Sequence, residues 1–233
     1  MSGGSGMGAS FDPDRITRLR GQLSPTAKST SGTALKLLWQ RAIAITLGAT
    51  ALLYGVEGVD TVSNHDLDSA GVKPRTMDGL SGIIFAPVLH ANWEHLIGNT
   101  LPFVVLGLLT LLTGIGRGLA ATAIIWVIGG LGVWLTAPSN TVTIGASILI
   151  FGFFTYLVSY GWFARNVLQI VVGVVVGLLY GSILLGILPG NPGISWQGHL
   201  FGAVGGLIAG WVLSGDERRH RRGATAGRLA SSG

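Results

Sequence analysis

Polar side chains that could perform acyl-transfer chemistry interrupt three apolar stretches of this sequence. Ser147 lies in "TVTIGASILIFGFF", His199 begins "HLFGAVGGLIAG", and His95 and Asn99 lie in "HANWEHLIGN". A serine hydroxyl becomes a nucleophile when a histidine about 3 Å away accepts its proton. These residue types therefore indicate a serine nucleophile with a histidine base.

Neither a third catalytic group nor a metal is expected beside this pair. No carboxylate lies in the same stretches at a matching depth, and Glu94 is at the margin, so a dyad is favoured over a Ser-His-Asp triad. The chain has no cysteine, and "WEHLIGN" does not supply the HExxH ligand motif of a metalloprotease. We therefore expect no metal and no cofactor.

The composition indicates that these residues belong to a membrane protein. Of the 233 residues, 48% are hydrophobic, only 11% are charged and 38 are glycine, which is far from the average of a soluble domain. Glycine is common where helix backbones approach each other closely in lipid. Polar groups inside membrane segments are costly and usually functional, so the polar residues above are candidates for a site.

The apolar runs predict an all-α fold of six transmembrane helices. Each span needs about 20 mostly apolar residues. The runs lie at residues 37–56, 96–112, 119–135, 146–160, 167–188 and 198–213. We expect residues 1–36 to be a cloning remnant followed by a mobile cytoplasmic tail, and residues 214–233 to be a basic cytoplasmic tail. The connection at residues 58–94 is too long to be a simple turn.

The lysines and arginines predict the orientation of the spans. Lys73 and Arg75 fall on one side of the six spans, and every other lysine and arginine falls on the side of the two termini. Positive charge marks the cytoplasmic side, so both termini are expected there. Because the basic residues flank apolar segments, the net charge of +5 indicates a topology signal and contact with the lipid bilayer, and not binding of nucleic acid.

The positions of the polar residues in the spans predict that they lie close together near the outer face of the membrane. Ser147, His199 and His95 lie at the outer ends of the three spans that enter the membrane from that side. His95 and Asn99 share one helix face because they are four residues apart. His90 is five residues before His95 and points about 140° away on a helix, so we expect it to support the site from the loop.

Small residues predict close packing of two of these helices. Gly202 begins a stripe of glycines at every fourth residue after His199, and Gly145 and Gly152 flank Ser147 on the expected neighbouring helix. Such residues let two backbones approach. Close approach is what a serine-histidine pair needs, since leucine-lined helices would hold the two short side chains too far apart.

At these motifs the sequence resembles the rhomboid family of intramembrane serine proteases. The similarity lies in "HANWEHLIGN" for HxxxxHxxxN, in "GASILIFG" for GxSGxxxG and in "HLFGAVGG" for HxxGxxxG. The resemblance implies that Ser147 is the nucleophile and His199 its base. It also implies that His95, Asn99 and the backbone N–H of Ser147 bind the oxyanion, and that Phe151 packs against the His199 ring.

The resemblance covers roughly residues 37–213 and implies a function. It implies hydrolysis of peptide bonds in transmembrane protein substrates, near the outer face of a bacterial plasma membrane. It further implies substrates with a helix-destabilising segment and a small residue before the scissile bond. The Pro/Gly-rich segment "LPGNPGISW" is expected to form a mobile cap over the site.

The sequence departs from the family pattern at two places. Ile148 replaces the second glycine of GxSG, and the Trp-Arg pair common in the first outer loop is missing. On a helix Ile148 projects about 100° away from Ser147, so the hydroxyl should stay reactive. We expect the Ile148 side chain to narrow the pocket for the substrate residue before the scissile bond.

Other functions are compatible with part of this pattern. A catalytically inactive rhomboid-like protein that binds membrane proteins would keep the fold, although it would be expected to lose Ser147 or His199. A channel or transporter would need polar groups along a path near the midplane, whereas here they gather at one face. His95 and Asn99 could also serve only as hydrogen-bonding groups between helices.

Overall fold

The computed structural model describes residues 13–190 and 193–215, with side chains from Gly32 onward. The chain divides into two compact units, Met1–Gln40 and Arg41–Gly233, and all candidate site residues lie in the second. The elements are α1 (Pro13–Val62), η1 (Asp66–Ala70), α2 (Met77–Phe85), η2 (Ala86–Val88), α3 (Trp93–Leu112), α4 (Ile115–Thr136), α5 (Ser147–Ala164), α6 (Val167–Tyr180), η3 (Gly181–Ile187) and α7 (Trp196–Leu213).

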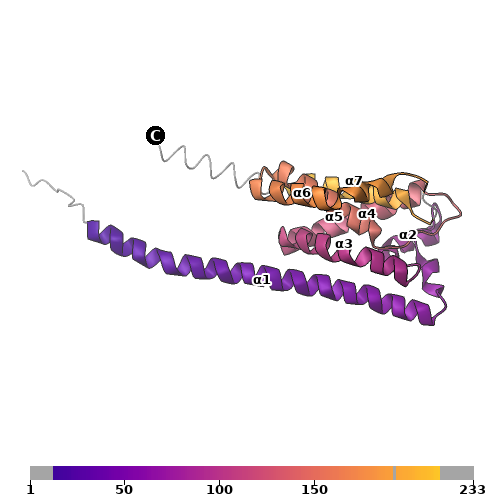
Figure 1. Cartoon of the computed structure of the whole chain (residues 1–233), viewed down its shortest axis with the longest axis horizontal. Helices are drawn as coiled ribbons and strands as arrows, with labels where there is room; N and C mark the ends of the chain where they lie inside the picture. The colour runs from indigo at the N-terminus through magenta and orange to yellow at the C-terminus, as the bar shows by residue number, and fades with distance from the viewer. Residues whose placement is uncertain (1–12, 191–192, 216–233) are drawn as a thin grey trace, which may run out of the picture. The chain divides into compact units, whose positions relative to one another are not determined.

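The second unit is a bundle of apolar helices, as predicted. Five helical segments of the described chain are long and apolar enough to cross a membrane: Gly32–Val62 within α1, then α3, α4, α5 and Val167–Ile187, which joins α6 and η3. The sixth helix is α7, which carries Gln197 and His199 among its apolar residues. Figure 1 shows α3 to α7 running along one another, with α2 at one end of the bundle. Each predicted span matches one of these helices.

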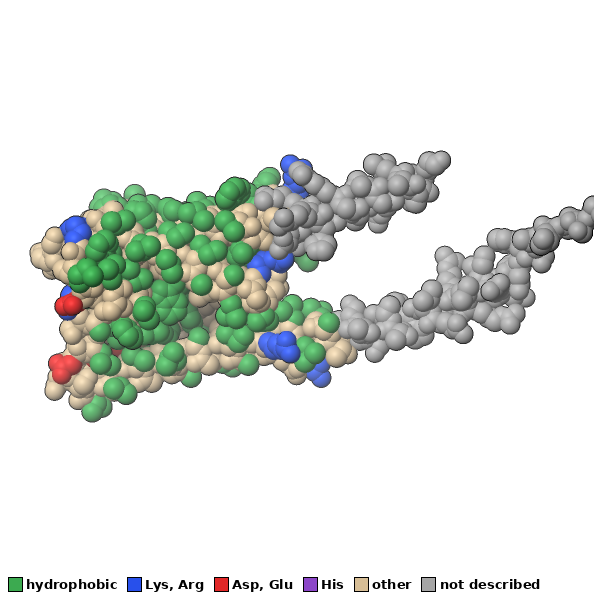
Figure 2. Space-filling model, turned by 180° about the vertical axis from the view of Figure 1, so that it is seen from behind, with side chains coloured by type: hydrophobic (Ala, Val, Ile, Leu, Met, Phe, Trp, Pro, Cys, Tyr) green, Lys and Arg blue, Asp and Glu red, His purple; other side chains and the backbone are tan. Residues whose placement is uncertain are grey.

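Burial differs strongly between the helices. In α5, 72% of the residues are buried, whereas only 11% are buried in the segment Val167–Ile187. Side chains such as Leu178, which is 82% exposed, face outward from α6. Figure 2 shows apolar side chains over most of the visible face of the bundle and acidic side chains at one end. An apolar outer surface of this kind suits a lipid environment.

The buried helix α5 packs closely against α7 and α4. A Cβ atom added to Gly206 of α7 would collide with the Gly152 carbonyl oxygen of α5, so only glycine allows this approach. Thr155 of α5 donates a hydrogen bond from Oγ1 to the Ala203 carbonyl oxygen of α7, at 2.7 Å. The predicted close contact of two glycine-bearing helices is therefore present.

The long connection at residues 58–94 is itself folded, and its helices were not predicted. It contains η1, α2 and η2, and two tryptophans of α4 hold α2 in place. Trp126 donates from Nε1 to the Ile83 carbonyl oxygen at 2.6 Å, and Trp134 donates to the Thr76 carbonyl oxygen at 2.8 Å. These bonds anchor the loop in a sequence that lacks the Trp-Arg pair.

The two expected tails are described only in part. Helix α1 begins at Pro13, so residues 13–36, which we expected to be a mobile tail, are helical. Residues 1–12 and the basic segment from residue 216 onward lie outside the described residues, as do residues 191–192 of the expected cap.

Candidate active site

The predicted site residues meet at one cavity of about 750 Å³. His95 and Asn99 reach it from α3, Ser147 and Phe151 from α5, and His199 from α7. Segments more than 100 residues apart in the sequence therefore share one cavity. The structure therefore brings together the four polar side chains that sequence spacing had grouped, and Phe151, which the resemblance had added.

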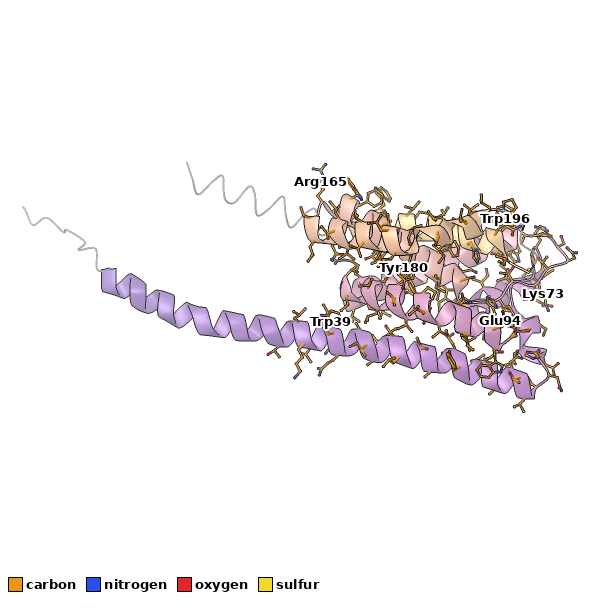
Figure 3. The ribbon with its side chains drawn as sticks, viewed as in Figure 1. Trp39, Lys73, Glu94, Arg165, Tyr180 and Trp196 are labelled. Carbon is orange, nitrogen blue, oxygen red and sulfur yellow. The ribbon has the colours of Figure 1, made fainter. Side chains whose placement is uncertain are left out.

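All three helices begin at the same end of the bundle. Figure 3 shows Glu94 and Trp196, at the starts of α3 and α7, at one end, and Arg165, which follows α5, at the opposite end. Ser147 is the first residue of α5, so it lies at the end where Glu94 and Trp196 are found. The N–H groups of the first helical turn have no intrahelical partners and carry a partial positive charge. The α5 N-terminus can thus stabilise negative charge beside the Ser147 hydroxyl.

The backbone before Ser147 requires a glycine. Gly145 has a φ of 118°, which strains residues with a Cβ atom. A Cβ atom at this position would also lie 2.7 Å from Cε1 of His95 and 3.8 Å from Oγ of Ser147. The glycine therefore lets the His95 ring lie next to the serine.

The His199 ring is held on two sides. Its Nδ1 atom is 2.8 Å from the Gly186 carbonyl oxygen of η3. Because a carbonyl oxygen only accepts, Nδ1 must carry the proton in this bond, and in the neutral ring Nε2 then has a free lone pair. The ring also stacks on Phe151, with centroids 4.0 Å apart and planes inclined by 10°. The predicted contact with Phe151 is present, and a backbone carbonyl orients the ring as an aspartate would in a triad.

Gly186 was not singled out in the sequence. A Cβ atom there would lie 2.9 Å from Cζ of Phe151 and 3.0 Å from Nδ1 of His199. The glycine lets η3 approach the His199 ring closely enough for the hydrogen bond. No local signal distinguishes it from the other glycines of "GLLYGSILLGI", because the need for it arises only from the packing of η3 on α5 and α7.

On the α3 side, Asn99 has a donor available for a ligand. Its Nδ2 atom is buried and has no hydrogen-bond partner within the described residues, although the side chain lines the cavity. A buried unpaired donor is costly, and an oxyanion in the cavity would satisfy it. Asn92 caps α3 by accepting a hydrogen bond from the His95 N–H at 2.9 Å, which fixes the start of this helix.

His90 supports the site and does not line its cavity. The Ala146 N–H donates to Nε2 of His90 at 3.3 Å, and the His90 and His95 rings meet edge to face with centroids 5.2 Å apart. Burial, with a smaller effect from neighbouring His95, lowers the pKa of His90 to about 4. A neutral His90 can accept the Ala146 hydrogen bond, in agreement with the expected structural role.

Ile148 differs from its expected position. Its side chain is 1% exposed and is absent from the cavity lining. It fills the space beside Gly129 of α4 and Gly198 of α7, and its carbonyl oxygen meets Gly202. The prediction that this side chain narrows the substrate pocket is therefore wrong, because the side chain points into the contact between α4, α5 and α7.

Ser195 is a further residue that the sequence analysis missed. Its Oγ atom accepts a hydrogen bond from the Gly198 N–H at 3.2 Å, which caps the start of α7 four residues before His199. It also accepts a bond from Oγ1 of Thr143 at 3.3 Å. A serine just before an apolar helical run is an N-cap signal, so this role could have been found from the sequence.

Within the described side chains, Ser147 Oγ makes no hydrogen bond with the His199 ring. Hydrogen bonds of catalytic groups are often long before substrate binds and tighten in the substrate complex. The two residues line the same cavity.

Comparison with known proteins agrees with this arrangement. Residues 78–216 match the Rhomboid domain model, which is more than half of the chain, and the protein belongs to the rhomboid family. An uncharacterized protein of Mycobacterium tuberculosis is 46% identical over 222 residues, 91% of each chain. Rhomboid-like protein 11, chloroplastic, of Arabidopsis thaliana is 31% identical over 162 residues, 56% of this chain and 51% of the relative. Rhomboid-like protease 5 of Toxoplasma gondii is 27% identical over 175 residues, 69% and 19% of the two chains. No solved structure matches.

Proposed function

We propose that this protein is an intramembrane serine endopeptidase that cleaves transmembrane segments of membrane proteins with a dyad of Ser147 and His199. The observation that carries the proposal is the hydrogen bond from Nδ1–H of His199 to the Gly186 carbonyl oxygen. In the neutral ring, this bond leaves Nε2 as the unprotonated nitrogen, and His199 shares a cavity with Ser147. A general base in this tautomer needs no aspartate.

In the proposed mechanism, Nε2 of His199 takes the proton of the Ser147 hydroxyl while Oγ attacks the carbonyl carbon of the scissile bond. The tetrahedral intermediate collapses when His199 gives that proton to the leaving amine, which leaves an acyl-enzyme ester on Ser147. A water molecule then loses a proton to His199 and attacks the ester carbon. The same proton returns to Ser147 as the carboxylic acid product departs.

The oxyanion of each tetrahedral intermediate would be stabilised from two elements. Asn99 contributes its unpaired Nδ2 donor, and His95 contributes a ring that lies beside Gly145. The backbone N–H of Ser147, at the positive end of α5, is the third donor. Preorganised donors of this kind supply a large part of catalysis in acyl transfer.

The site is assigned to the outer face of a bacterial plasma membrane, with both termini in the cytoplasm. Arg165 follows α5 at the end of the bundle opposite Ser147, which agrees with a cytoplasmic location of that end by the positive-inside rule. The partners are transmembrane substrates and the lipid bilayer. Gly193, Ile194 and Ser195 line the cavity, which supports a role for this segment as a cap that opens for substrate.

A fluorophosphonate probe tests the nucleophile directly. The detergent-solubilised protein should be labelled at Ser147, and a model transmembrane substrate in liposomes should be cleaved. Ser147→Ala should abolish both, whereas Ser81→Ala, which changes an exposed serine of α2, should abolish neither. Labelling at another residue, or cleavage by the Ser147→Ala variant, would overturn the assignment.

The second candidate is a rhomboid-like protein without catalytic activity that binds membrane proteins. The lack of a hydrogen bond between Ser147 and His199 in the described side chains is the observation that favours it. It predicts a folded wild-type protein that binds transmembrane segments but neither reacts with the probe nor cleaves them.

A further inference from the structure

A second cluster of polar residues lies at the end of α1 and in the turn that follows it. Asp60, His65 and Asp68 each offer one ligand atom, and these atoms all lie within 4.8 Å of one another. Nδ1 of His65 is 3.3 Å from Oδ2 of Asp60. None of these residues lines the catalytic cavity.

Glu57 adds a buried carboxylate to this cluster. It lies one helical turn before Asp60, so the two share a face of α1. Only 1% of Glu57 is exposed, and neither of its carboxylate oxygens has a hydrogen-bond partner within the described residues. Glu57 therefore adds an unpaired carboxylate on the face of α1 that carries Asp60.

The cluster lacks a matching positive charge. Asp60 is also only 1% exposed, and Oδ1 of Asp68 is buried without a hydrogen-bond partner in the described chain. The ion pair of His65 with Asp60 is the only salt bridge among the described residues. Unpaired buried carboxylates are strongly unfavourable, and a cation between them would remove that cost.

The backbone arranges these side chains before any ligand binds. Asn64 and His65 have φ values of 57° and 63°, and these two left-handed residues turn the chain back toward α1. Asp60 accepts the Leu67 N–H at Oδ1, 2.8 Å away, and its carbonyl oxygen accepts the His65 N–H at 2.9 Å. The turn is therefore tied to the carboxylate that forms the centre of the cluster.

We propose that Asp60, His65 and Asp68 bind a divalent transition-metal ion beside the unpaired Glu57 carboxylate, and Zn²⁺ is the probe for this ion. Carboxylate oxygens and an imidazole nitrogen are ligands that Zn²⁺ takes at about 2.0–2.2 Å. The imidazole favours such an ion over Ca²⁺ or Mg²⁺, which prefer oxygen ligands alone. The expectation of no metal rested on the lack of cysteine and of HExxH, whereas the proposed ligands come together only across a turn.

The ion would connect α1 to the loop that supports the catalytic serine. The end of α1 lies beside the start of α3, since the Tyr54 and Trp93 ring centroids are 6.0 Å apart. The Asp68 carbonyl oxygen accepts the Gly71 N–H, and Val72 pairs with Thr143 in an antiparallel bridge. The proposed ion thus has a structural role, and it does not depend on the protease assignment.

The test is a zinc titration of the full chain by isothermal titration calorimetry, in detergent and after removal of metals with a chelator. We expect one Zn²⁺ per chain and a higher Tm at saturating Zn²⁺. Asp60→Asn keeps an oxygen that can accept the Leu67 N–H, and His65→Gln changes a side chain that is 43% exposed, so both variants should fold. Each should weaken zinc binding by about 10-fold or more.

Asp66→Asn is the matched control, because it removes an exposed carboxylate from the same turn, and it should bind Zn²⁺ as the wild type does. His199→Ala should also retain zinc binding. The proposal is wrong if the wild type binds no Zn²⁺ or if Asp60→Asn and His65→Gln bind it normally. Loss of binding in His199→Ala alone would assign the ion to the catalytic histidines and would equally overturn it.

Discussion

Ser147 is supported from two sides of the molecule that are built differently. On one side, α7 and α4 pack directly against α5, through glycines and the buried side chain of Ile148. On the other side, the connection at residues 58–94 reaches the loop before Ser147 through single hydrogen bonds, such as that from the Gly145 N–H to the Ala86 carbonyl oxygen at 2.8 Å.

We call the contact of α5 with α4 and α7 the packed side, and the connection at residues 58–94 the bonded side. The two sides fix different features of the site. The packed side fixes how far the serine is from His199, because a change of helix separation would require many atoms to move together. The bonded side fixes the conformation of the loop before Ser147 through individual hydrogen bonds, such as that of Gly145 with Ala86. The packed side should therefore respond to changes of volume, and the bonded side to changes of pH or of single donors.

The largest effect is expected at Ile148, where the two sides meet. Its side chain clusters with Val133 of α4 and with Val72 and Ala86 of the connection. Ile148→Ala should lower the free energy of unfolding by about 2–5 kcal/mol, measured as a lower Tm. Ile97→Ala, on a side chain that is 60% exposed, is the control and should leave Tm nearly unchanged.

The same Ile148 variant also tests the corrected position of this side chain. Because Ile148 does not line the cavity, the preference for the substrate residue before the scissile bond should be the same in the variant and the wild type. If the variant has a normal Tm and accepts bulkier residues at that substrate position, the Ile148 side chain lines the substrate pocket after all.

The bonded side should weaken in acid through His90. Folding lowers the His90 pKa from 6.5 to about 4, so between these values the unfolded state binds more protons than the folded state. The free energy of unfolding therefore has its full value above about pH 6.5, and it falls by roughly 3 kcal/mol as the pH drops to about 4. His90→Gln keeps an acceptor for the Ala146 N–H. Its Tm should fall less between pH 7 and pH 4.5 than the Tm of the wild type. Equal losses in both proteins would show that His90 is not the group responsible.

A smaller effect is expected from a single methyl group on the packed side. Gly206→Ala would drive a Cβ atom into the Gly152 carbonyl oxygen, and such overpacking costs about 1–3 kcal/mol. Gly177→Ala on α6 is the matched control, because its Cβ atom would lie 4.0 Å from the nearest atom, Cγ2 of Val158. The Tm of Gly206→Ala should be lower than that of Gly177→Ala. Cleavage by Gly206→Ala should also be lower than cleavage by the wild type. If both alanines are tolerated equally, close packing of α7 is not what holds the dyad together.

The packed side was largely predictable from the sequence and the bonded side was not. Apolar runs and the glycine stripe after His199 predicted the helices, the contact of α5 with α7 and the grouping of four polar site residues, and the resemblance added Phe151. Helical periodicity is a local signal that survives in one sequence. The hydrogen bonds of His199 with Gly186 and of Ala146 with His90 depend on tertiary approach between segments, for which the sequence carries no periodic signal. Ile148 was misplaced for the same reason, since its direction depends on how α5 is rotated against α4.

The smallest expected effect concerns the anchor of the connection on α4. Trp126→Phe removes the indole N–H that donates to the Ile83 carbonyl oxygen of α2, while the apolar contact is largely kept. Loss of one hydrogen bond of this kind costs about 0.5–1.5 kcal/mol, so Tm should fall slightly. Trp162→Phe, which changes a side chain that is 65% exposed, is the control. Because α2 leads into η2 and the Ala86 carbonyl that holds Gly145, Trp126→Phe should also lower kcat, whereas KM should stay close to that of the wild type. An unchanged kcat with the expected fall in Tm would mean that α2 stabilises the bundle without positioning Ser147.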